Sequence, residues 1–167
     1  AAILNNLQEG DVLFVDEEAL KTDPDALGGS SLADFRALYS SMKAEDTTEI
    51  KRHVQTVQEE WASRGVAFRE NERIRLITVF FHDKPTEEES LLFVGHVGVL
   101  LTAEDGTLYF VEKVAFQEPY RLLRFAGRTA LSDYLMGKYD ASWGQDTASP
   151  FIMENDELMD VKSRHAK

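Results

Sequence analysis

The stretch that decides the fold reads Phe93-Val94-Gly95-His96-Val97-Gly98-Val99-Leu100-Leu101-Thr102-Ala103-Glu104-Asp105-Gly106-Thr107-Leu108-Tyr109-Phe110-Val111-Glu112. Two apolar segments flank a short turn that ends in Gly106, and this pattern predicts a β-hairpin. A single imidazole, His96, stands inside the first apolar segment. Burying a polar ring costs free energy unless the ring is hydrogen-bonded, so we expect His96 to have a partner. Gly95 and Gly98 would weaken a strand unless another group approaches it closely, which makes His96 the first candidate for a functional residue.

The hairpin register decides which side chain meets His96. If the turn has three residues, with its glycine in the left-handed conformation, Glu112 lies one diagonal step from His96 on the same face. A shift of one residue would instead present Lys113 or Tyr109. A carboxylate bound to one ring nitrogen fixes the tautomer and raises the basicity of the ring, as a general base requires. The same pair could also be a satisfied buried contact without any chemistry.

These residues offer no nucleophile that would complete a hydrolytic site. The chain has no cysteine, so disulfides, thiolate metal sites and a cysteine nucleophile are excluded within it. It also has no Gly-x-Ser-x-Gly turn. We interpret Ser132, Ser142 and Ser149 as ordinary serines of a helix surface or of loops. The catalytic candidates are therefore His96 and Glu112 alone.

The remaining histidines do not predict a metal site. Metal ligands must converge within a few ångströms, whereas strand geometry places His82 several residues away from the level of His96. We interpret His53, which lies beside Val54 on the expected helix 50–61, as a residue at the boundary between core and surface, and we expect neither a metal nor a cofactor. Tyr120, Trp143 and Asp146 lie in connecting segments that could wall a pocket, although such aromatic residues more often belong to a core.

Composition excludes several classes of partner. The 167 residues carry a formal net charge of -12, which argues against binding to nucleic acid or to an anionic membrane, because both need clustered Lys and Arg. No apolar run is long enough to span a bilayer, so we expect no transmembrane segment. The acidic clusters 23–25, 87–89 and 154–160 are expected to be solvated loops, since they lack the spacing of a calcium loop.

The order of patterns predicts an α+β domain in which helices pack on one side of an antiparallel sheet of about four to six strands. Expected helices are residues 1–7, 32–42 with a Ser31–Asp34 capping box, 50–61 with Asp46 as the cap, and 129–139. Expected strands are residues 66–69, 74–82, 91–101 and 107–116, and residues 150–153 are expected to form a returning strand or an extended segment.

Residues 1–160 are expected to form a single domain, followed by a tail at 161–167 that contains His165. Ala1-Ala2-Ile3-Leu4-Asn5-Asn6-Leu7 has an apolar helical pattern but no capping residue before it. We therefore expect this helix to have lost its beginning. The sequence predicts no oligomeric state.

Several motifs resemble an uncharacterised domain family, DUF4300, of bacterial and largely Gram-positive surface lipoproteins. They are Phe93-Val94-Gly95-His96-Val97-Gly98-Val99-Leu100, Phe110-Val111-Glu112-Lys113-Val114-Ala115-Phe116, Glu118-Pro119-Tyr120, Leu131-Ser132-Asp133-Tyr134-Leu135-Met136, Lys138-Tyr139-Asp140 and Pro150-Phe151-Ile152-Met153-Glu154-Asn155-Asp156. The resemblance covers residues 10–157. It implies a location at the cell surface with a lipid anchor, and it assigns no function.

Gly95-His96-Val97-Gly98-Val99 is also similar to the histidine strand of the NlpC-type papain-like hydrolases. In those enzymes a cysteine at a helix N-terminus pairs with a histidine on the sheet, and a polar residue on the next strand orients the ring. This resemblance implies a papain-like fold with His96 as base and Glu112 as its orienting residue, acting on a peptide or a cell-wall-type amide. The chain departs from the pattern because it has no cysteine, so the nucleophile would have to precede Ala1.

The residues leave two other readings open. One is an extracellular ligand-binding module that keeps the fold and uses the groove beside His96 without catalysis. The other is a folded domain in which the His96–Glu112 pair is purely structural.

Overall fold

The computed structural model describes residues 32–69, 71–115, 118–141, 144 and 146–159. The expected helix at 1–7, the Ser31 cap and the tail lie outside these residues. The elements are α3 (Leu32–Tyr39), β1 (Met42–Lys43), α4 (Ile50–Ser63), β2 (Ile74–Asp83), β3 (Leu91–Thr102), β4 (Leu108–Glu112), β5 (Arg121–Phe125), α5 (Arg128–Tyr139), β6 (Phe151–Glu154) and β7 (Glu157–Leu158).

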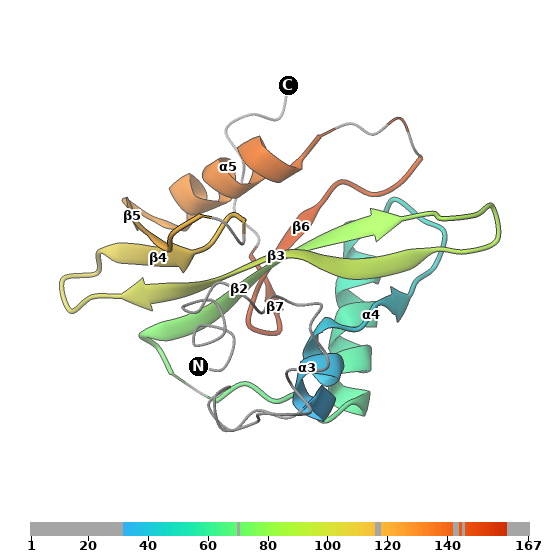
Figure 1. Ribbon diagram of the computed structural model, residues 1–167, viewed down its shortest axis with the longest axis horizontal. Coiled ribbons are helices and arrows are strands. Elements are labelled where there is room, and N and C mark those ends of the chain that lie inside the picture. Colours follow the sequence, from blue (N-terminus) through green and yellow to red (C-terminus); the bar gives the residue numbers. More distant parts are fainter. Residues whose placement is uncertain (1–31, 70, 116–117, 142–143, 145, 160–167) are drawn as a thin grey trace.

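The α+β prediction is confirmed. The described strands form one antiparallel sheet in the order β5-β4-β3-β2-β6-β7, and β1 pairs with β3 off this path. These seven strands exceed the four to six expected. Helix α5 lies on one side of the sheet, and α3 and α4 lie on the other (Figure 1). The expectation that helices cover one side only is therefore wrong.

Each face of the sheet has its own apolar core. Under α5, Leu131 and Leu135 pack against Ile77, Leu100 and Phe110. Under α4 the cluster is different and consists of Met42, Val54, Val57, Trp61, Phe80, Leu92, Phe151 and Met153. Because β2 and β3 supply buried side chains to both clusters, they are the central strands, as their nearly continuous apolar sequence indicates.

A β-bulge at Gly95 switches the faces of β3. Val79 pairs with His96 but Phe80 pairs with Val94, so Gly95 is the extra residue. Before the bulge, Leu92 and Val94 face the α4 cluster. After it, His96 faces α5 instead. A Cβ atom at Gly95 would overlap the ring of Phe81, which accounts for a glycine at this position.

Several expected boundaries are wrong near α3 and α4. Helix α3 ends at Tyr39, and Met42 belongs to β1, where it pairs with Leu92. The residue at the start of α4 is Glu49, without a side-chain cap, while Asp46 accepts a hydrogen bond from Lys84. Residues 66–69 form no strand, although Val66 and Phe68 pack against the α4 cluster.

The short and peripheral strands were not predicted from the sequence. The segment 107–116 contains β4 only as far as Glu112, and β5 returns beside it in reverse. Strand β5 reads Arg121-Leu122-Leu123-Arg124-Phe125 and is mostly exposed, so it lacks the clean alternation that marks a half-buried strand. Strands β1 and β7 have two residues each, too few to show any period.

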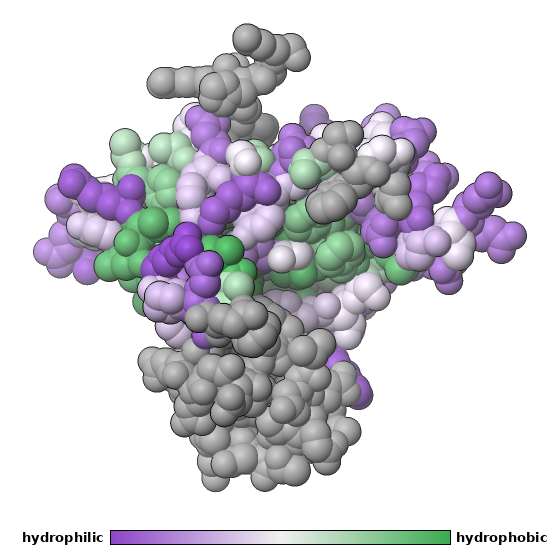
Figure 2. Space-filling model, turned by 45° about the horizontal axis from the view of Figure 1, so that its top comes forward, coloured by the Kyte–Doolittle hydropathy of each residue, from purple (hydrophilic) through white to green (hydrophobic). Residues whose placement is uncertain are grey.

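Hydrophilic side chains cover both ends of the long axis of the molecule (Figure 2). One end is the β3–β4 turn, and the other is the β2–β3 connection, in which residues 87–89 are exposed as expected. The cluster that begins at Glu154 is not simply a solvated loop, because Glu154 lies on β6 and binds Arg128 at 2.6 Å. Among the described residues, none of the helices has the length and apolar character that crossing a membrane requires.

Candidate functional site

The hairpin brings His96 and Glu112 together. The turn has three residues, with Ala103 and Thr107 hydrogen-bonded across it and Gly106 at φ 81°. This turn fixes the register in which Gly98 pairs with Glu112. Glu112 is then the diagonal neighbour of His96, and the distance from Nε2 of His96 to Oε2 of Glu112 is 2.8 Å.

Glu112 is almost completely buried, with 1% of its surface exposed, and it accepts hydrogen bonds from three side chains. His96 donates to Oε2, while Tyr134 and Lys138 donate to Oε1, the latter over 3.1 Å. Burial alone would raise the pKa of this carboxyl group. The hydrogen bonds from His96, Tyr134 and Lys138 outweigh that effect and lower the pKa to about 2. Glu112 is therefore an ionised carboxylate at neutral pH.

Helix α5 packs over His96 and Glu112. Tyr134 and Lys138 are one helical turn apart, and Lys138 donates to the Tyr134 hydroxyl at 2.5 Å as well as to Glu112. Burial and the bond to Glu112 raise the pKa of Tyr134, so its hydroxyl stays protonated and can act as a donor. The next residue, Tyr139, stacks on the His96 ring, with 4.8 Å between ring centroids.

The two ring nitrogens of His96 have different surroundings. Its Nε2 atom must donate a proton to the Glu112 carboxylate, because an ionised carboxylate can only accept. In the described part of the chain, Nδ1 makes no hydrogen bond and is not among the fully buried polar atoms that lack one. Only 8% of the whole residue is exposed. In the neutral ring Nδ1 is the basic nitrogen.

The contacts that α5 makes with His96 and Glu112 were not predicted from the sequence. Helical periodicity turns Tyr134 toward the sheet, but nothing in the sequence connects it with Glu112. Lys138 carries a charge on a helix and would ordinarily be read as solvent-facing. The available signal is the i, i+4 spacing of Tyr134 and Lys138, which places these two side chains on one face of α5.

Gly98 makes room for this arrangement. A Cβ atom at Gly98 would overlap the ring of Phe110 and lie 2.8 Å from the carbonyl oxygen of Val111. Phe110 in turn contacts the His96 ring, with 6.4 Å between centroids.

We expect Gly98→Ala to lower the free energy of unfolding by about 1–3 kcal/mol, measured by urea denaturation, because the hairpin must shift to accept the methyl group. The control is Gly137→Ala in α5, where nothing lies within 4 Å of the new Cβ atom. That change should raise the stability by about 0.5–1 kcal/mol, since alanine favours a helix interior. Equal effects of the two changes would contradict the close approach at Gly98.

A second histidine cluster lies on the opposite face of the sheet. His53 is completely buried rather than at the boundary between core and surface, and its ring centroid is 4.4 Å from that of His82. Nδ1 of His82 accepts from the backbone of Ala148, and Nε2 is 2.8 Å from Oγ of Ser90. Burial, with His53 nearby, lowers the pKa of His82 and keeps its ring neutral.

The His82–Ser90 contact is not a nucleophile–base pair. Because Ser90 Oγ donates to the carbonyl of Glu45, it must accept from Nε2 of His82. The imidazole then has no free lone pair with which to activate the serine. His82 and His96 also lie on opposite faces, so they cannot share a metal ion. Among the described residues, no group of three acidic or histidine side chains is placed to hold one.

The other candidate residues do not join the site. Ser132 is buried on α5 rather than on the helix surface, Ser149 is exposed, and Ser142 lies outside the described residues. Asp146 is exposed. Trp143 and the start of the chain at Ala1 also lie outside the described residues.

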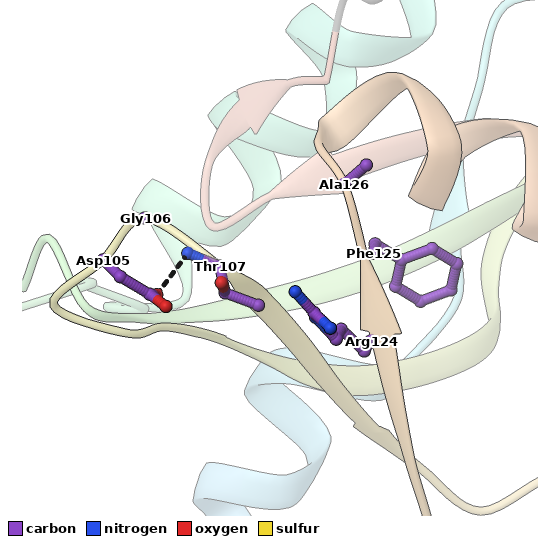
Figure 3. Close-up of a pocket in the computed structure, with 6 residues that line it drawn as sticks. All are labelled: Asp105, Gly106, Thr107, Arg124, Phe125 and Ala126. Carbon is purple, nitrogen blue, oxygen red and sulfur yellow. Dashed lines mark hydrogen bonds between the residues drawn. The ribbon is translucent and has the colours of Figure 1, made fainter.

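A pocket of about 460 Å³ opens elsewhere on the molecule. Its lining comes from the β3–β4 turn and the end of β5, namely Asp105, Gly106, Thr107, Arg124, Phe125 and Ala126 (Figure 3). Asp105 bonds the backbone of Thr107 at 2.9 Å and so is engaged in the turn itself. The pocket is at the Leu108 end of β4, about 14 Å along the strand from Glu112. It is therefore separate from the His96 site.

Comparison with known proteins gives one match. The model of a family described as a domain of unknown function, DUF4300, matches residues 3–159. No curated protein and no solved structure matches the chain.

Proposed function

Since the chain belongs to the DUF4300 family, which brings no assigned activity, we propose a function from the site itself: a papain-like hydrolase of amide or peptide bonds. In this proposal His96 is the base and Glu112 is the residue that orients it. The observation that carries the proposal is that the two ring nitrogens of His96 have different surroundings. Its Nε2 is held at 2.8 Å by a buried carboxylate, while Nδ1 makes no hydrogen bond within the described part of the chain.

The described geometry is suited to this role. An orienting carboxylate fixes the tautomer and stabilises the imidazolium that forms when the ring takes a proton. Glu112 stays ionised because its pKa is about 2, so it supplies a full negative charge beside the ring. Tyr134 and Lys138 hold its other oxygen and prevent the carboxylate from turning away.

The nucleophile in this proposal is a cysteine carried before Ala1 in a longer polypeptide. Nδ1 of His96 would take the thiol proton, and the thiolate would attack the carbonyl carbon of the amide. The imidazolium would then protonate the leaving amine as the C–N bond breaks, leaving a thioester. His96 would next take a proton from water, whose oxygen attacks the thioester and releases the carboxylic acid and the thiol.

We place the reaction at the bacterial cell surface, on a peptide or cell-wall-type amide, because the sequence motifs resemble those of surface lipoproteins. The relationship to papain-like enzymes is supported by a histidine on a central strand and an orienting residue on the next strand. It is a proposal from this arrangement and from the short Gly95–Val99 motif.

The test uses the longer polypeptide with its upstream residues. We expect His96→Ala to reduce hydrolysis of an amide substrate by at least about 10²–10⁴-fold, because the base is removed. His82→Ala is the control, since it removes an equally buried imidazole from the other face of the sheet. Loss of activity in His96→Ala alone supports the proposal.

A second readout separates chemistry from folding. In the native protein, iodoacetamide should alkylate the cysteine rapidly below neutral pH, since an imidazolium stabilises the thiolate. In His96→Ala the alkylation rate should rise only toward the ordinary thiol pKa of about 8.5. Unchanged alkylation, surviving hydrolysis, or a polypeptide without any cysteine before Ala1 would each overturn the hydrolase assignment. His96 and Glu112 would then be a structural pair.

A further inference from the structure

Strand β3 has an interrupted edge beside His96. On the side away from β2, β1 pairs with Leu91 and Leu92, and β4 pairs with β3 only from Gly98 onward. In the described part of the chain, residues 93–97 therefore have no neighbouring strand on that side. Strand β4 ends at Glu112, and the chain bends at Val114 and Ala115 instead of continuing the ladder.

The exposure of this segment fits an open edge. Gly95 is exposed although it lies in the middle of a central strand, and because glycine has no side chain, the exposed group is backbone. Among the described residues, two of the four large apolar side chains that are exposed also flank the interruption. They are Phe93, at 39% exposure, and Val114, at 37%. A solvated backbone bordered by apolar side chains is what an extended peptide chain would cover.

We propose that residues 93–97 bind the substrate as an added β-strand, so that the substrate class is an extended peptide. The inference rests on the proposed hydrolase function and names how its substrate is held. Backbone N–H and C=O groups of every second residue point to each side of a strand, so this edge can pair with peptide groups of a ligand.

The same geometry brings the peptide to the imidazole. An added strand lies about 4.8 Å from β3, and side chains on one face of neighbouring strands lie about 5 Å apart. A peptide in the place where β4 would continue is thus beside His96. The bulge at Gly95 turns His96 to this face, which joins the binding edge and the base in one segment.

The test uses the 167-residue chain and the peptide acetyl-Lys-Val-Thr-Val-Thr-Val-Lys-amide, followed by amide NMR. Without peptide, some amide protons of residues 93–97 should exchange rapidly with solvent. With peptide, their exchange should slow, and saturable shifts should centre on these residues. The same peptide with all five central amides N-methylated has equal charge and side chains. It should bind at least about tenfold more weakly, because it cannot form the ladder.

Protein variants supply the matched comparison. Phe93→Ala should weaken binding by a few fold or more, whereas Leu122→Ala, at the most exposed apolar residue of β5, should not. Because the 167-residue chain contains no cysteine, this test measures binding without hydrolysis, so that a failed hydrolase assignment and a failed binding edge give different results. Amides of residues 93–97 that are all protected in the dilute free chain would overturn the inference. So would equal binding of the methylated peptide, or the absence of saturable shifts.

Discussion

Replacing Glu112 with glutamine is expected to lower the free energy of unfolding by about 3–5 kcal/mol. The change removes the buried charge that pairs with Lys138 and accepts from His96 and Tyr134. An amide presents an NH₂ group to at least one of these donors, so a buried donor loses its partner. Urea denaturation measures the effect.

Glu104→Gln is the matched control. Glu104 lies in the β3–β4 turn of the same hairpin and makes an exposed ion pair with Arg73 at 3.3 Å. Exposed pairs contribute about 0–1 kcal/mol, so this change should have almost no effect on stability. If Glu112→Gln were as mild as Glu104→Gln, the three contacts would not be holding the hairpin to α5.

The free energy of unfolding should also depend on pH, because Glu112 has a different pKa in the folded and unfolded chain. Its pKa is about 2 in the folded chain and 4.5 ordinarily. A lowered folded pKa contributes stability that is present above pH 4.5 and is lost as the pH falls toward 2. A shift of this size corresponds to about 3 kcal/mol.

Unfolding free energies measured between pH 5 and pH 2 should therefore fall by about 3 kcal/mol more in the native chain than in Glu112→Gln. Glu104→Gln should follow the native curve, because it leaves the buried cluster intact. Parallel curves for the native chain and Glu112→Gln would show that the carboxylate is not selectively stabilised in the folded state.

The hairpin was the most predictable part of the molecule. A short turn with Gly106 in the left-handed conformation fixes its own register, so the encounter of His96 with Glu112 follows from counting residues. The remainder of the site depends on tertiary packing. Lys138 approaches Glu112 only because α5 crosses β4, and no local pattern predicts that crossing.

Three features of the fold were not predicted. The bulge at Gly95 changes which face His96 occupies, and a lone glycine in a strand signals only that something approaches closely. His53 was misplaced although a signal was present, because it lies four residues before Val57 on the buried face of α4. Strand β5 was not predicted, because a mostly exposed strand that contains two arginines lacks the alternation of a half-buried strand.

The decisive measurement is the pair of ¹⁵N chemical shifts of the neutral His96 ring. We expect them to show a proton on Nε2, because the Glu112 carboxylate accepts it, and a lone pair on Nδ1. A neutral ring protonated at Nδ1 would contradict this expectation, since that nitrogen could then not serve as a base.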